Sequence, residues 1–98
     1  MQFILIGGDG NTIEAIGMNF VRSEVHVRAG QPVTLHVVNR DGYAHAFDVD
    51  EFDIHAPLPA KTTFDAAFTP TEPGRYRFYC DAPGHEAAGM EGVLVVEP

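Results

Sequence analysis

Hydrophobic and polar residues alternate with a period of two along several short segments of this chain. In Val33–Asn39, residues Val33, Leu35 and Val37 fall on one face and the residues between them on the other. Successive side chains of a β-strand point to opposite faces, so this alternation predicts a half-buried strand. We expect strands over Gln2–Ile6, Thr12–Phe20, Glu24–Arg28, Val33–Asn39, His45–Val49, Thr62–Phe68, Arg75–Cys80 and Gly92–Val96.

Turn-forming residues separate these segments. The chain has ten Gly and seven Pro, many of them between the predicted strands. We expect Asp50–Pro59, which holds two prolines, to be irregular, and Asp81–Met90 to be a loop. No segment has the periodicity of an amphipathic helix. About eight short, regularly spaced strands predict an all-β fold, a two-sheet sandwich with Greek-key crossings, with a closed barrel as the second choice.

Length and charge narrow the possible functions. A chain of 98 residues makes one domain, 1–98. Its formal net charge of −8 argues against nucleic acid as a partner and against docking on anionic lipid, because both need clustered Lys and Arg. A basic protein partner would complement this charge, although the acids also serve solubility. No segment is long enough for a membrane span, and Met1–Ile6 lacks the features of a secretory signal.

Four side chains carry the most distinctive chemistry. Cys80, the single cysteine, is followed within eleven residues by His85 and Met90, and His45 lies 35 positions before it. Taken alone, Cys80 would be interpreted as a small buried hydrophobic residue. His45 would likewise be interpreted as a solvated residue in a turn. Together, two imidazoles, a thiolate and a weak thioether are the ligands of a blue-copper electron-transfer site.

Other chemistries fit this donor set less well. A Cys–His nucleophile pair needs an orienting acid and a substrate cleft, and neither is marked in the sequence. Structural zinc favours more Cys or His at short spacings, and a redox dithiol needs a second Cys. Of the other histidines, His26 and His36 occupy polar strand positions and are expected at the surface. His55, in the Pro-rich segment, is expected near the rim of the site at most.

The sequence resembles the cupredoxins, the family of type 1 (blue) copper proteins, and is especially similar to the plastocyanin type. The resemblance covers roughly Glu24–Val96. The segments that carry it are Val25–Asn39, His45–Glu51, Pro73–Cys80, Gly84–Met90 and Gly92–Val96.

The resemblance implies a cupredoxin-like Greek-key sandwich with one copper ion near one end. His45, Cys80 and His85 would be its equatorial ligands and Met90 its axial ligand. His85 would pass electrons through an apolar end face, and Tyr79 would offer a second route beside an acidic patch. The end face would comprise Pro83, Gly84, Ala87 and Ala88, and the acidic patch Asp48, Asp50, Glu51 and Asp53.

Two features depart from the plastocyanin pattern. Four residues, Asp81–Gly84, separate the cysteine from the loop histidine, whereas plastocyanin has two. The longer spacing is more similar to rusticyanin, plantacyanin and the type 1 sites of multicopper oxidases. Ala46 occupies the position where the family commonly has a polar residue, often Asn, that ties the two ligand segments together. That tie is therefore expected to be absent or supplied elsewhere.

The resemblance implies a non-enzymatic carrier of single electrons between redox protein partners, met transiently and as a monomer. The alternatives are a copper carrier or store that delivers metal to an oxidase, and a type 1 domain derived from a multicopper enzyme. A further alternative is a β-sandwich interaction module that binds no metal and has this donor set by chance. Either the protein is cytoplasmic or a leader has been removed, and we expect a periplasmic or other extracytoplasmic location.

Overall fold

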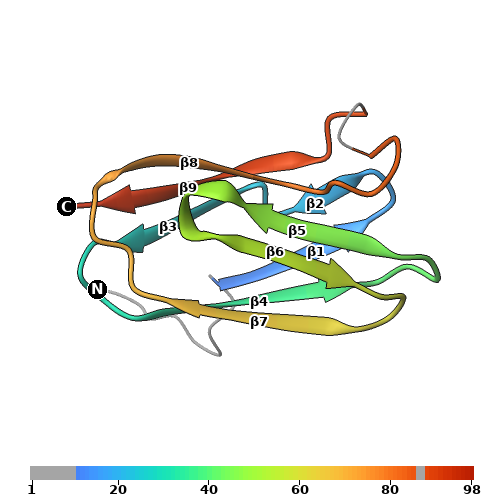
Figure 1. The fold of residues 1–98 in the computed structure, drawn as a ribbon, viewed down its shortest axis with the longest axis horizontal. Helices are drawn as coiled ribbons and strands as arrows, with labels where there is room; N and C mark the ends of the chain where they lie inside the picture. The colour runs from blue at the N-terminus through green and yellow to red at the C-terminus, as the bar shows by residue number, and fades with distance from the viewer. Residues whose placement is uncertain (1–10, 86–87) are drawn as a thin grey trace.

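Two β-sheets pack face to face in this protein (Figure 1). The computed structural model describes residues 11–85 and 88–98. Within these residues there are nine strands and one 3₁₀ turn, so the predicted all-β fold is confirmed. The elements are β1 (Thr12–Ile16), β2 (Asn19–Val21), β3 (Glu24–Arg28), β4 (Val33–Asn39), β5 (His45–Val49), η2 (Asp50–Phe52), β6 (Ile54–Leu58), β7 (Thr63–Phe68), β8 (Gly74–Tyr79) and β9 (Glu91–Glu97). The expected strand Gln2–Ile6 lies outside the described residues.

The chain crosses repeatedly between the two sheets. One sheet has the strand order β2-β1-β4-β7 and the other β3-β9-β8-β5-β6. The pairs β1–β4 and β3–β9 are parallel, and the remaining pairs are antiparallel. Parallel neighbours cannot be joined by a tight hairpin, so these pairs need crossover connections. Such crossings are those of the predicted Greek-key sandwich.

Two predicted elements differ from the structure. The expected strand Thr12–Phe20 is a hairpin of β1 and β2, because Gly17 adopts a left-handed φ of 62° and reverses the chain. The segment Asp50–Pro59, expected to be irregular, contains η2 and the regular strand β6. Strand β6 pairs only with β5 at the edge of its sheet, where Pro57 can be accommodated without the loss of a ladder hydrogen bond.

The core lies between the inner faces of the two sheets. Phe20 from one sheet contacts Phe47 and Phe78 from the other, with ring centroids 6.0 and 5.3 Å apart. Burying one such side chain contributes about 1.5–3 kcal/mol. These contacts join the sheets beneath the strand ends that carry the candidate metal ligands.

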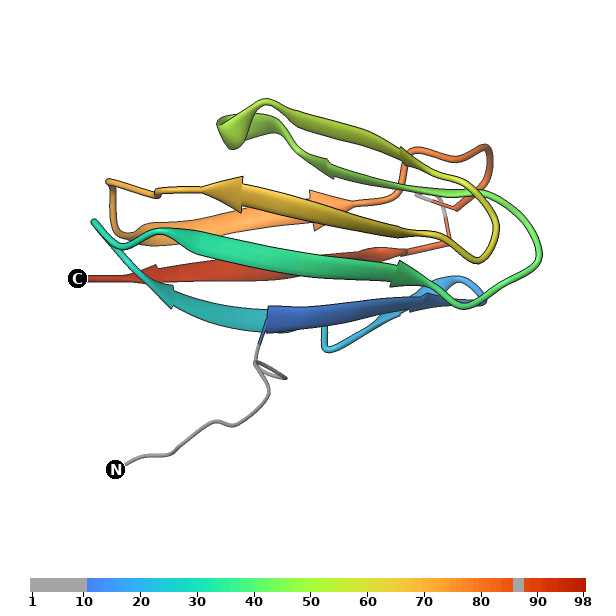
Figure 2. The same ribbon diagram turned by 90° about the horizontal axis from the view of Figure 1, so that it is seen from below.

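Four connections gather at one end of the molecule, away from the C-terminus (Figures 1 and 2). They are the β1–β2 turn and the β4–β5, β6–β7 and β8–β9 loops. The candidate ligands lie at this end, at or beyond the ends of β5 and β8. Among the described residues, no helix has the length and apolar character that crossing a bilayer requires.

Candidate metal centre

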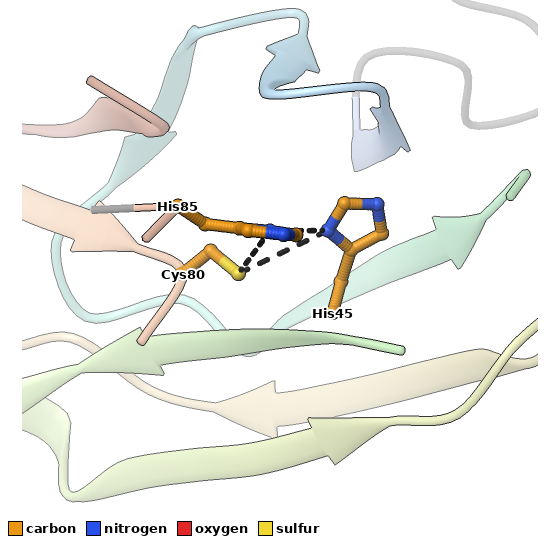
Figure 3. A group of neighbouring side chains, drawn as sticks. All are labelled: His45, Cys80 and His85. Carbon is orange, nitrogen blue, oxygen red and sulfur yellow. Dashed lines mark hydrogen bonds between the residues drawn. The ribbon is translucent and has the colours of Figure 1, made fainter. Parts of the chain in front are cut away.

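The side chains of His45, Cys80 and His85 converge on one point (Figure 3). The two Nδ1 atoms lie 3.1 Å apart, and the Cys80 Sγ lies 3.5 Å from Nδ1 of His85 and 3.9 Å from Nδ1 of His45. Within the described part of the chain, this is the one group of three or more His, Cys, Asp or Glu side chains with ligand atoms within 4.8 Å of one another. We call these three residues the Cys–His centre.

The spacing of the three donors fits a metal ion. The three distances define a triangle whose circumscribed circle has a radius of about 2 Å, close to the 2.0–2.3 Å of metal–imidazole and metal–thiolate bonds. The three side chains could therefore hold a single ion at bonding distance. A thiolate with two imidazoles is also the trigonal donor set that copper takes in blue-copper sites.

Different elements hold the three donors. His45 is the first residue of β5, and Cys80 directly follows β8. His85 lies in the β8–β9 loop, where its amide donates to the Ala82 carbonyl at 3.0 Å and its carbonyl accepts from the Met90 amide at 3.1 Å. The centre therefore combines rigid strand ends with a loop that is closed by its own backbone hydrogen bonds.

Met90, the predicted axial ligand, lies at the end of the same loop. Its side chain is fully buried in the core, and its carbonyl accepts a 3.1 Å hydrogen bond from the Cys80 amide. That bond holds the two ends of the loop together. The Met90 backbone is thus fixed beside Cys80, and the axial role of its thioether stays a prediction.

Cys80 is shielded from water. Its burial raises the pKa of the thiol above its usual value, although hydrogen bonds from the Ala82 and Ala46 amides oppose this shift. The Ala46 amide lies 3.3 Å from Sγ. The tie between the two ligand segments, which the Ala side chain cannot supply, is therefore made by the backbone.

Asp41 was not recognised as a site residue from the sequence. Its Oδ2 lies 2.8 Å from Nε2 of His45, the ring nitrogen that faces away from Cys80. The hydrogen bond with His45 holds the pKa of the Asp41 carboxyl below its usual range, against the opposing effect of burial. In the sequence, only its position in a turn four residues before His45 could have indicated this contact. Acidic residues are common in turns, so that position alone did not identify Asp41.

The end face around His85 is exposed, as the family resemblance implied. Pro83, Gly84 and Ala88 are exposed, whereas Ala87 lies outside the described residues. Tyr43, whose side chain is also exposed, has its ring centroid 5.1 Å from that of His45 and 6.0 Å from that of His85. The Cys–His centre is thus buried just beneath a surface rich in small and apolar residues.

The expected acidic patch is smaller than predicted. Asp48 is buried, with 1% of its surface exposed, on β5 between the neighbouring strands β6 and β8. Burial raises the pKa of its carboxyl, and one of its oxygens, Oδ2, has no hydrogen-bond partner. Asp50, Glu51 and Asp53 are exposed and form what we call the acidic segment.

His55 lies on β6 rather than in an irregular segment. It is half-exposed, and its Nδ1 lies 3.2 Å from Oδ1 of Asp48. Both residues line a cleft of about 350 Å³ that also touches His45. His55 is therefore near the rim of the centre but not part of it. His26 and His36 are at the surface, as predicted, and pair with acidic side chains.

Comparisons with known proteins agree with this geometry. The family model of the cupredoxin-like domain matches residues 9–96. The chloroplastic plastocyanin minor isoform of Arabidopsis thaliana is 34% identical over 96% of this chain, which spans 57% of that relative's length. Plastocyanin A/B of Petroselinum crispum is 31% identical, with 82% of this chain and 89% of the relative covered.

A solved structure shares the fold. Auracyanin A of Chloroflexus aurantiacus, described as a "blue" copper protein, superposes with a TM-score of 0.76 at 23% identity, over 88% of this chain and 96% of its own. At that identity the likeness concerns the fold alone. The match of the family model along nearly the whole chain, together with the plastocyanin relatives, shows that this chain belongs to the cupredoxin family.

Proposed function

We propose that this chain is a type 1 (blue) copper protein that carries single electrons between redox partners. His45, Cys80 and His85 would be the equatorial ligands of one copper ion and Met90 its axial ligand. Copper in such a site takes up and releases one electron by cycling between Cu(II) and Cu(I). The relatives support this reading, since they are plastocyanins and the protein with the shared fold is described as a "blue" copper protein.

One observation carries the proposal: a buried thiol and two buried imidazole nitrogens lie 3.1–3.9 Å from one another. A thiolate and two imidazoles that face one another in this way are the donor set that copper takes in blue-copper sites. Strand ends and a hydrogen-bonded loop hold these donors on a rigid scaffold. Rigid donors change little in geometry between two oxidation states, which favours rapid electron transfer.

His85 would be the exit for electrons. It is 7% exposed, compared with 3% for His45 and 0% for Cys80, so it comes nearest to the surface. The exposed Pro83, Gly84 and Ala88 around it would let a partner approach closely. An interface of this kind is small, as expected for short-lived encounters.

A basic redox protein would dock on the acidic segment. Tyr79 adjoins Cys80 in sequence, and its hydroxyl donates a 2.8 Å hydrogen bond to Asp50. The side chains of Asp50 and Asp53 are 62% and 100% exposed, so their charges face the solvent and any approaching cation. If docking is electrostatic, raising the salt concentration slows electron transfer to a basic partner. A rate that is insensitive to salt would remove the acidic segment from the docking surface.

Burial of the donors favours an electron carrier over a copper carrier. Handing over the metal would require the side chains of His45 and Cys80 to become accessible, and the folded protein buries both. Electron transfer needs no such opening. The two functions differ in their products: a carrier of electrons is re-reduced and retains its copper, whereas a carrier of copper loses it to an acceptor.

We further propose that residues 1–98 form a single, non-enzymatic and monomeric domain in an extracytoplasmic compartment. The two sheets enclose one continuous core cluster, as a single domain requires. The plastocyanin relatives support the electron-carrier role, since proteins of that type pass electrons to redox partners.

The decisive experiment is the optical and EPR spectrum of the protein after addition of Cu(II). We expect an intense visible thiolate-to-copper band and its loss in Cys80→Ser. His36→Ala, which removes a surface histidine, should keep the band. A colourless copper complex of the wild-type protein would reject the proposal.

A further inference from the structure

Asp41 and His45 form a hydrogen bond behind the Cys–His centre. The two atoms, Oδ2 and Nε2, are 2.8 Å apart, and the His45 side chain is fully buried. A carboxylate can only accept, so the proton of this bond belongs to Nε2 of the imidazole. In the neutral ring, Nδ1 then carries the lone pair, and this is the nitrogen that faces Cys80 and His85.

The carboxylate of Asp41 is itself held in place from two sides. Its Oδ2 also accepts a 2.7 Å hydrogen bond from the amide of Gly17 in the β1–β2 turn. Its backbone amide donates to the buried Asn39 side chain at 2.8 Å, and its carbonyl accepts from the Lys61 amide at 3.1 Å. Loops from both sheets therefore fix the position of this acid, which cannot turn away without breaking several hydrogen bonds.

We propose that Asp41 is a positioning residue for the metal centre: it holds the His45 ring with Nδ1 turned inward and places a negative charge behind that ligand. The inference rests on the proposed function. An acceptor behind a ligand histidine fixes its tautomer and raises its basicity, and the loss of such a partner typically costs 10- to 100-fold in metal affinity. A negative charge also favours Cu(II) over Cu(I), since the oxidised ion carries one more positive charge.

Asp41→Asn separates the charge from the hydrogen bond. The amide oxygen of Asn can accept from both His45 and Gly17, so the ring should keep its orientation while the negative charge is lost. We expect the variant to keep its visible band and to have a higher reduction potential. A tenfold loss of Cu(II) affinity, with Cu(I) affinity unchanged, raises the midpoint by about 59 mV.

Asp41→Ala removes the acceptor altogether. Nitrogen-15 NMR of the copper-free protein reports which ring nitrogen of His45 carries the proton. We expect the Nε2–H form alone in the wild type and a mixture of the two tautomers in Asp41→Ala. This readout does not depend on copper, so it tests the positioning role even if the wild-type protein fails to form a blue site.

The matched control is Asp65→Asn. Asp65 also pairs with a histidine, His36, at 2.8 Å, but both side chains are exposed and lie outside the Cys–His centre. This control loses the same charge and should leave the potential and the His45 tautomer unchanged. The proposal is overturned if Asp41→Asn shifts the potential no more than Asp65→Asn, or if His45 in the wild-type protein carries its proton on Nδ1.

Discussion

The backbone amide of Ala46 lies 3.3 Å from the sulfur of Cys80 and donates a hydrogen bond to it. This bond links the first residues of β5 to the residue that follows β8, so it joins the two segments that supply ligands. A backbone amide persists whatever side chain occupies position 46. The loss of a polar side chain there is therefore compatible with a tied pair of ligand segments.

Metal affinity should rise with pH because the thiol of Cys80 must lose its proton. Burial raises the pKa of the Cys80 thiol above the ordinary value for a thiol, about 8.5, so the thiol of the metal-free protein is protonated at pH 7. Each bound ion then displaces one thiol proton, and affinity increases about tenfold per pH unit below that pKa. Competition with a chelator, using redox-inert Zn²⁺ between pH 7.0 and 8.5, measures this slope.

Cys80→Ser is the control for that experiment. The serine hydroxyl does not ionise in this range, so the slope should fall by about one proton per ion. A wild-type affinity that stays constant with pH would mean that the thiol is already ionised or is not a ligand.

Gly92 has no space for a side chain. A Cβ built on it would overlap the ring of Phe78 and lie 2.5 Å from the carbonyl oxygen of Ser23. Phe78 is fully buried in the core, so its ring cannot move aside freely. We expect Gly92→Ala to lower the free energy of unfolding by about 1–3 kcal/mol, as overpacking typically does. Urea denaturation of the metal-free protein measures the change.

Gly42→Ala provides the comparison. A Cβ at Gly42 would meet nothing within 4 Å, and both substitutions restrict the unfolded chain in the same way. We expect this variant to be as stable as the wild type or slightly more stable. Equal stabilities for the two variants would contradict the close packing at Gly92.

Most strands could be predicted from the sequence because alternation reports local burial. Strand β4 shows this clearly, since Val33, Leu35 and Val37 are buried as their spacing indicates. Strand β6 was missed although Ala56 and Leu58 are buried in alternation, because Pro57 argues against a strand unless it lies at a sheet edge. The edge position is a property of the assembled sheet, which a local pattern does not contain.

The donors of the candidate centre could be predicted because their residue types are rare and chemically specific. Asp41 and Asp48 could not, since acids are frequent in this chain and their roles depend on neighbours in space. Asp48 and Asp50 are two positions apart in sequence, yet one is buried in a strand and the other is exposed. The carboxylate of Asp41 accepts hydrogen bonds from His45 and from Gly17 of the distant β1–β2 turn, and the position of that turn is a property of the assembled fold.

Asn39 should be important for stability. Its buried side chain donates to the carbonyls of Tyr43, Leu58 and Pro59, at 2.8, 2.9 and 3.1 Å. Asn39→Ala would leave buried carbonyls without a partner, at a cost of about 1–3 kcal/mol. Thermal or urea unfolding measures this loss, and Asn19→Ala, at an exposed position of β2, should change stability by less than about 0.5 kcal/mol. Similar losses in the two variants would show that the Asn39 bonds contribute little.

The stability of the protein should also depend on pH through Asp48. Burial raises the pKa of its carboxyl above the ordinary value of 3.8, with the hydrogen bond from His55 opposing the shift. Because the native state holds this proton more tightly than the unfolded state, the stabilising contribution is complete below pH 3.8 and is lost as pH rises through the native pKa. Asp48→Asn cannot ionise and avoids this loss. Its stability relative to the wild type should therefore increase from pH 4 to pH 7, as measured by urea unfolding of the metal-free protein at each pH. Any pH-independent effect of the introduced amide cancels in that comparison, so the slope of relative stability against pH reports the ionisation of Asp48.

The control is Asp53→Asn, which removes a charge from a fully exposed side chain and should show a much weaker dependence of stability on pH. If the two variants follow the same pH profile, burial of Asp48 does not determine its ionisation.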